Sequence, residues 1–308
     1  MGEYVDIGGV NTWFDEEGTG EPLVLLHGGL CTNETWAAQM PVFAERFHVV
    51  APERRGHGHT ADVPGPLTFA DMATDTIGFL DRIVGGPAHL VGWSDGGIVG
   101  LLVAIERPDL VRKLVAIGAN YDTAGIAPEA EDMAANMAPD SDDMAMFRGL
   151  YEMHSPDGPE HWPVFFGKFT EMLQREPHIP VDDLGRLSAP TLVVMGDDDL
   201  MSVEHSAALF RSIPNSELAV VPGASHAVVI EKPELLNRIV LDFLENEPVP
   251  TMMPRQAGRN RCGDALAGLE ALRQRSEHPT QRGRFRPRRV VRPNGPRMPR
   301  RSPTGSCA

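Results

Sequence analysis

Residues 90–97 read Leu90-Val91-Gly92-Trp93-Ser94-Asp95-Gly96-Gly97 and place a serine in a Gly-x-Ser-x-Gly pattern. The apolar run Ala88–Val91 precedes the pattern, and a longer run of apolar and small residues, 98–105, follows it. The first run predicts a strand and the second a helix. A serine on such a strand-to-helix turn has a strained backbone and an exposed hydroxyl, and the flanking glycines give the turn room. The stretch therefore predicts an α/β fold with Ser94 as a nucleophile.

A nucleophilic serine needs a base to take its proton and an acid to orient that base. Two segments offer these groups: Thr191–Met195 is apolar and ends in Gly196-Asp197-Asp198-Asp199, and Leu218–Val221 is apolar and ends in Pro222-Gly223-Ala224-Ser225-His226. Each polar group follows a predicted parallel strand, at the sheet edge where open α/β folds build their sites. A serine, an aspartate and His226 therefore occur in the order nucleophile, acid, base.

This order, with His27-Gly28-Gly29 after the apolar run Leu23–Leu26, resembles the α/β-hydrolase fold family over residues 8–247. Residues 51–60 resemble the family's D-x-R-G-x-G-x-S loop, with Glu53 in place of the aspartate and Thr60 in place of the serine. The string GWSDGG and residues 117–120, IGAN, are similar to the biphenyl-hydrolase-like, or valacyclovir hydrolase, group. The resemblance implies a mostly parallel central sheet flanked by helices, with a helical cap inserted after the sixth strand.

The chain divides into three kinds of segment. We expect the α/β core to comprise residues 1–120 and 187–247, and the helical cap to comprise the Met- and acid-rich stretch 121–186. Residues 248–308 are rich in Arg and Pro, with one plausible short helix at 264–275, and we expect this tail to be disordered. The alternative for the tail is a binding role toward nucleic acid or an acidic surface.

Charge and composition limit the partners and the compartment. The formal net charge of −15 divides into −26 for residues 1–248 and +11 for residues 249–308, and an acidic body disfavours nucleic acid as its partner. We find no 18-residue apolar span, no signal peptide and only three cysteines, too few for a disulfide framework. These features predict a cytoplasmic protein without a membrane partner, and we expect neither a metal nor a cofactor.

Several residues compete for two of the roles in the site. The family's Gly-x-x-Asp spacing from Gly196 implies Asp199 as the acid, whereas Asp197 and Asp198 are expected to cap the following turn. Asp122 is a remote fourth candidate. For the oxyanion hole we expect the backbone amides of Asp95 and Gly29, with Leu30 as the next choice for the second amide.

Residues around these groups are candidates for substrate binding, namely His27, Leu30, Trp93, Asp95, Phe165 and Phe166. An alternative for His27 is a purely structural hydrogen-bonding role. Asp95 has two interpretations: a favourable charge at a helix N-terminus, or a carboxylate that selects substrates with a cationic amine, as the biphenyl-hydrolase-like resemblance implies.

The residues predict hydrolysis of a carboxylic ester of a small, largely apolar substrate through an acyl-enzyme. The serine argues against haloalkane dehalogenases and epoxide hydrolases, whose elbow carries aspartate. Lactone hydrolysis, carbon–carbon bond hydrolysis and perhydrolysis use the same Ser-Asp-His set and stay open. A slow-turnover ligand receptor with this fold is the alternative from another class.

Overall fold

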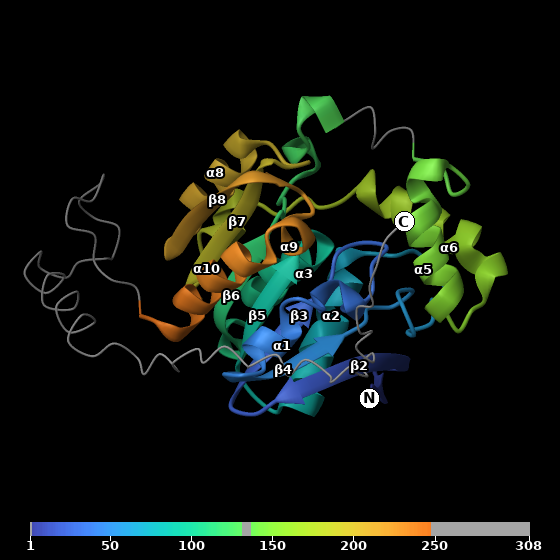
Figure 1. The fold of residues 1–308 in the computed structure, drawn as a ribbon, viewed down its shortest axis with the longest axis horizontal. Helices are drawn as coiled ribbons and strands as arrows, with labels where there is room; N and C mark the ends of the chain where they lie inside the picture. Colours follow the sequence, from blue (N-terminus) through green and yellow to red (C-terminus); the bar gives the residue numbers. More distant parts are fainter. Residues whose placement is uncertain (1, 131–136, 248–308) are drawn as a thin grey trace, which may run out of the picture. The chain divides into compact units, whose positions relative to one another are not determined.

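An eight-stranded sheet lies at the centre of the structure, in the order β1-β2-β4-β3-β5-β6-β7-β8 (Figure 1). The computed structural model describes residues 2–130 and 137–247. β1 and β2 pair antiparallel with each other and β2 with β4, whereas all pairs from β4 to β8 are parallel. The predicted mostly parallel central sheet is confirmed. The strands are β1 (Glu3–Ile7), β2 (Val10–Gly18), β3 (Glu21–Leu26), β4 (Phe47–Pro52), β5 (Ala88–Trp93), β6 (Val111–Ile117), β7 (Thr191–Asp198) and β8 (Ser216–Ser225).

Helices cover both faces of this sheet (Figure 1). Successive side chains of a strand point to opposite faces, and in β3 Leu23 and Leu25 enter one hydrophobic cluster while Val24 and Leu26 enter the other. The cluster around Leu26 also holds side chains from α2, α3 and α8, and the cluster around Leu25 holds side chains from α1, α9 and α10. The helices are α1 (Met40–Phe43), α2 (Phe69–Phe79), α3 (Asp95–Glu106), α5 (Ala145–His154), α6 (Trp162–Leu173), α7 (Val181–Leu184), α8 (Val203–Ser212), α9 (Val228–Glu231) and α10 (Pro233–Glu245).

The segment between β6 and β7 is built from α5, α6, α7 and short turns, with no strand of the sheet among its described residues. Aromatic side chains of α6, including Trp162 and Phe165, belong to the same cluster as the helices on one face of the sheet. The segment therefore packs on the core at the position predicted for a cap. The predicted tail, residues 248–308 with its helix at 264–275, lies outside the described residues.

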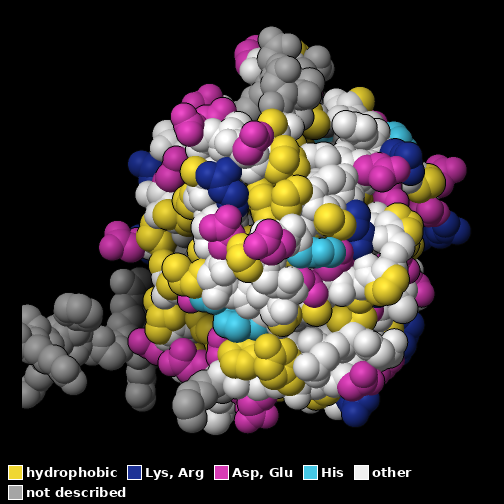
Figure 2. Space-filling model, turned by 90° about the vertical axis from the view of Figure 1, so that its right-hand side faces the viewer, with side chains coloured by type: hydrophobic (Ala, Val, Ile, Leu, Met, Phe, Trp, Pro, Cys, Tyr) yellow, Lys and Arg dark blue, Asp and Glu magenta, His cyan; other side chains and the backbone are white. Residues whose placement is uncertain are grey.

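Figure 2 shows the face to the right in Figure 1, where α5 and α6 lie. Apolar and acidic side chains are mixed over this face, and the basic side chains stand apart from one another. Met146 and Met153 of α5 and Val164 of α6 are among the exposed large apolar side chains. Among the described helices, none is both long and apolar enough to span a bilayer.

Candidate active site

Ser94 follows the last residue of β5 and precedes α3, so it occupies the predicted strand-to-helix turn. Its backbone has φ 55° and ψ −122°, a conformation that residues other than glycine rarely adopt. The Ser94 N–H donates to Ile117 O on the neighbouring strand β6 at 2.7 Å, which anchors the turn. A Cβ atom on Gly92 would lie 2.2 Å from Gly96 O, so the turn closes only because the residue at position 92 has no side chain.

His226 lies within hydrogen-bond reach of Ser94. The distance from His226 Nε2 to Ser94 Oγ is 2.9 Å, and the distance from His226 Nδ1 to Asp199 Oδ1 is 2.7 Å. The imidazole thus lies between a hydroxyl and a carboxylate, and a neutral ring with its proton on Nδ1 leaves Nε2 free to accept the hydroxyl proton. The Asp199 carboxylate is fully buried and also accepts from the N–H groups of Gly196 and Met201, both at 3.2 Å.

The register of β7 and β8 explains why Asp199 and His226 meet. Asp198 pairs with Ser225 in the parallel ladder, and Asp199 and His226 are the next residues of their chains. Asp197, by contrast, accepts the Ala224 N–H at 3.2 Å across the same ladder.

The expectation that Asp197 and Asp198 cap the following turn is wrong, because β7 continues through Asp198 and both residues still belong to the sheet. The N-cap of α8 is instead Ser202. Asp122 binds His178 and caps a short turn, and is no partner of His226.

Gly118, in the IGAN string, had no predicted role but lies beside the imidazole of His226. It follows Ile117, the last residue of β6, and has φ +57°. A Cβ atom there would lie 3.0 Å from Nδ1 and Cε1 of His226 and 3.4 Å from Asp199 Oδ2. The absence of a side chain at position 118 therefore leaves space for the imidazole.

The loop His27-Gly28-Gly29 crosses the turn that carries Ser94. A Cβ atom on Gly28 would lie 2.9 Å from the Trp93 ring, and one on Gly29 would lie 2.5 Å from Asp95 Oδ2. The two glycines thus pass directly beside the residues on either side of the serine. Among the described residues, no acceptor takes the N–H of Gly29 or that of Asp95. An oxyanion hole requires free amide donors beside the nucleophile, and the assignment of these two N–H groups to that role stays a prediction.

Asp95 places a buried carboxyl group at this loop. The residue is 4% exposed, and its Oδ2 has no hydrogen-bond partner among the described residues. Burial raises the pKa of Asp95, while the positive charge of Arg54 and the nearby His226 oppose that rise. An unpaired buried carboxyl oxygen carries a desolvation cost that a hydrogen-bonding ligand would relieve.

The other predicted substrate-binding residues lie in different surroundings. Trp93 donates from Nε1 to His226 O at 2.8 Å and so holds the histidine loop, while Leu30 has φ 57° in the turn after Gly29. Phe165 and Phe166 are buried within α6 packing, against Tyr151 and Trp162 among others. The α6 aromatic beside the glycine loop is instead Phe169, whose ring would lie 2.7 Å from a Cβ atom on Gly29. Sequence reasoning did not single out Phe169 as a site residue.

The surroundings of His27 fit its alternative, a structural hydrogen-bonding role. It is fully buried, its Nε2 accepts the Arg54 N–H at 3.2 Å, and its Nδ1 donates to Gly28 O at 2.7 Å. Burial and the charge of Arg54 lower the pKa of His27 well below its ordinary value, so the ring is neutral. Both nitrogens are engaged by backbone groups, which favours this role over the expected contact with substrate.

The neighbouring loop, residues 53–60, is built around the buried carboxylate of Glu53. Glu53 accepts from the His59 N–H at 2.6 Å and from the Asn33 N–H at 3.3 Å, and Thr60 Oγ1 donates to Glu53 O at 3.0 Å.

Cys31 is buried, and burial raises its thiol pKa to about 11. No group of three or more His, Cys, Asp or Glu side chains among the described residues is arranged to hold a metal ion.

Proteins of known family that resemble this chain include hydrolases. Residues 23–239 match the alpha/beta hydrolase family. The chain is 30% identical over 254 residues to a putative carbamate hydrolase RutD of Caulobacter sp. (strain K31), covering 73% of this chain and 91% of the relative. It is 26% identical to the serine hydrolase BPHL of Homo sapiens, covering 78% and 85%. Among solved structures, a thermophilic esterase from Thermogutta terrifontis superposes with a TM-score of 0.64 and 26% identity, covering 80% and 98%.

Proposed function

The chain belongs to the alpha/beta hydrolase family, and we propose that it is a serine hydrolase that cleaves carboxylic esters through an acyl-enzyme on Ser94. The observation that carries this proposal is the continuous contact from Ser94 Oγ through His226 to Asp199, at 2.9 and 2.7 Å. These distances lie within the range in which a base takes a proton from a nucleophile. The strained backbone of Ser94 supports the same role.

The reaction follows from the charges that form at each step. Ser94 Oγ attacks the acyl carbon while its proton passes to His226 Nε2, and Asp199 stabilises the imidazolium. The carbonyl oxygen becomes an oxyanion, which the N–H groups of Gly29 and Asp95 are free to bind. The bond to the alcohol then breaks and the alcohol leaves with the proton from His226. Water, deprotonated by His226, attacks the acyl-enzyme, which releases the acid and restores the Ser94 hydroxyl.

A substrate panel tests the proposed reaction. We expect the protein to hydrolyse p-nitrophenyl esters and to be labelled by a fluorophosphonate probe. The Ser94→Ala variant should lose both the hydrolysis and the labelling. The same panel includes lactones and an aromatic diketone, because the triad also serves those reactions. If a lactone or a diketone is turned over faster than any ester, hydrolysis of that substrate becomes the proposed activity in place of ester hydrolysis. Tight ligand binding with negligible turnover would indicate a receptor.

For the substrate class, we propose that Asp95 favours esters that carry a cationic amine near the acyl carbon. Its unpaired Oδ2 lies beside Gly29, one residue from the nucleophile, so an ammonium group bound there would supply the missing hydrogen bond. A carboxylate substrate would instead meet repulsion at this position.

The ratio of kcat/KM for aminoacyl esters to kcat/KM for neutral esters of equal size tests the role of Asp95. In Asp95→Asn we expect this ratio to fall about tenfold or more, because a charged hydrogen bond of about 1.5 to 3 kcal/mol is lost. The neutral esters are the internal control for damage to the oxyanion hole. An unchanged ratio would leave Asp95 with only its backbone amide and its charge at the start of α3.

A further inference from the structure

Arg54 is a buried cation directly behind the glycine loop. Its guanidinium donates from Nη1 to His27 O and from Nη2 to Gly28 O, the latter at 3.1 Å. The residue is 4% exposed, and it contacts two carbonyl groups of the loop that crosses the nucleophile. A buried guanidinium is costly unless its donors are used, so its place behind this loop calls for a function.

The carbonyl groups held by Arg54 fix the direction of the amides that follow them. In a trans peptide the C=O and N–H groups point in opposite directions, and the one cis peptide bond among the described residues precedes Pro177. Gly28 O points toward Arg54 Nη2 and His27 Nδ1, so the Gly29 N–H points away from them. That N–H is one of the two donors assigned to the oxyanion.

We infer that Arg54 is a positioning residue of the oxyanion hole. Its planar fork holds the carbonyls of His27 and Gly28 and thereby aims the Gly29 N–H at the site of the developing negative charge. This inference rests on the proposed acyl transfer at Ser94. Arg54 acts through the peptide and does not touch the substrate.

The charge of Arg54 adds to this geometric role. A hydrogen bond from a cation to Gly28 O polarises the peptide and makes the Gly29 N–H a stronger donor. Burial lowers the pKa of Arg54 to about 10, with Asp95 and Cys31 opposing that shift, so the guanidinium is charged at neutral pH. The stabilisation applies when the oxyanion forms, and its effect belongs to the transition state more than to substrate binding.

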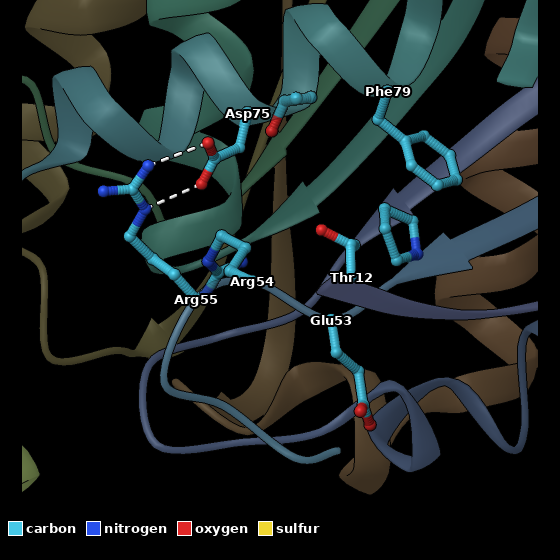
Figure 3. Close-up of a pocket in the computed structure, with 8 residues that line it drawn as sticks. Thr12, Glu53, Arg54, Arg55, Asp75 and Phe79 are labelled. Atoms are coloured by element: carbon cyan, nitrogen blue, oxygen red, sulfur yellow. Dashed lines mark hydrogen bonds and ion pairs between the residues drawn. The ribbon is translucent and has the colours of Figure 1, made fainter. Parts of the chain in front are cut away.

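Arg55 provides a matched control in the next residue. Figure 3 shows Arg55 turned toward Asp75 of α2, with which it forms two hydrogen bonds of 2.7 and 2.8 Å. Thr12, Glu53, Arg54 and Phe79 line the same small pocket, and no member of the Ser94 triad does. Both arginines are therefore largely buried residues of one loop, but only Arg54 contacts the glycine loop.

The test compares Arg54→Met, Arg54→Lys and Arg55→Met in the full chain. We measure kcat and KM for the best p-nitrophenyl ester and the affinity for a trifluoromethyl ketone, whose adduct with Ser94 carries an oxyanion. Arg54→Met is expected to lower kcat about 10- to 100-fold with KM changed less than about threefold, somewhat less than direct loss of one oxyanion donor. The ketone affinity should fall by the same factor as kcat/KM.

The other two variants separate positioning from general support of the fold. Arg54→Lys keeps the charge but loses the fork, so its kcat is expected to lie between that of wild type and that of Arg54→Met. Arg55→Met is expected to lower the urea midpoint while kcat and ketone affinity stay near wild type. If Arg54→Met does not fold, the comparison of Arg54→Lys with Arg55→Met decides whether Arg54 positions the oxyanion hole or only supports the fold.

Two outcomes overturn the inference. With an active wild type, folded Arg54 variants that keep kcat and ketone affinity, or that match Arg55→Met in every measurement, would show that Arg54 only supports the fold. If the wild type shows no Ser94-dependent hydrolysis or labelling, the proposed function itself fails and the role of Arg54 fails with it.

Discussion

Gly118 lies directly behind the imidazole of His226: a Cβ atom on Gly118 would approach His226 Nδ1 and Cε1 to 3.0 Å. The same glycine has φ +57°, which disfavours any side chain by about 1 kcal/mol. Two separate requirements, a left-handed backbone and an empty space for the histidine, therefore meet at one residue. Neither depends on the identity of the substrate.

Gly118→Ala is expected to lower kcat by about 10- to 100-fold, because a small displacement of a catalytic base costs that much in rate. Steady-state kinetics on a p-nitrophenyl ester measures the loss. Gly8→Ala is the matched control, since Gly8 has φ +60° and a Cβ atom there would meet nothing within 4 Å. Equal losses in the two variants would show that backbone strain, and not the contact with His226, causes the effect.

Asp199→Asn tests the assignment of the acid among three consecutive aspartates. We expect kcat to fall by up to about 10⁴-fold, because an amide at this position favours the wrong imidazole tautomer. Asp197→Asn removes the charge but keeps an oxygen that can accept the Ala224 N–H, and it leaves His226 untouched, so its kcat should stay within about threefold of wild type. A larger loss in Asp197→Asn than in Asp199→Asn would reverse the assignment.

The buried His57 makes stability depend on pH. Burial and the charge of Arg54 lower the pKa of His57 to about 3, against about 6.5 in the unfolded chain. Between those values the unfolded state binds a proton that the folded state does not, so the free energy of unfolding falls as the pH falls below 6.5.

Between pH 7 and pH 5, His57 is expected to lower the free energy of unfolding by about 2 kcal/mol. Urea denaturation at both values should therefore show a smaller difference in His57→Gln than in wild type. Identical differences in the two proteins would contradict an uncharged His57 in the folded state.

Asp62 connects the loop after β4 to the predicted cap. Its carboxylate accepts from His161 Nε2 at 2.9 Å and from Lys168 Nζ at 2.5 Å, and its own N–H donates to Asp157 Oδ2 at 2.7 Å. Asp62→Asn leaves Lys168 without its counter-charge. The substitution is expected to lower the free energy of unfolding by on the order of 3 kcal/mol.

Hydrogen exchange of the α6 amides is the measurement for Asp62, and it should accelerate in the variant while exchange in β5 is little changed. Uniform acceleration across the core, or none, would show that Asp62 does not hold the cap locally.

The three residues predicted as a triad meet in the structure for a physical reason. Ser94, Asp199 and His226 each lie one residue beyond the end of a parallel strand, so their meeting follows from strand order and register. The apolar runs located these strands but not all of their ends, because the polar ends of β7 and β8 still pair with each other and extend the two strands to Asp198 and Ser225.

Other parts of the site depend on contacts that no local pattern encodes. Arg54 and Arg55 are adjacent loop arginines, and which of them reaches the glycine loop depends on how two distant loops approach each other. Phe165, Phe166 and Phe169 are all buried, and the orientation of α6 decides which one reaches Gly29. The free space behind His226 at Gly118 is likewise visible only once β6 and the histidine loop are placed.

The central claim is that Ser94 forms a covalent acyl-enzyme, and mass spectrometry of the acid-quenched reaction with a p-nitrophenyl ester tests it most directly. We predict a mass increase of one acyl group on the peptide that contains Ser94, its accumulation when deacylation is slowed, and its absence in Ser94→Ala. Turnover of the ester with no acyl adduct, or with the adduct on another residue, would contradict the account.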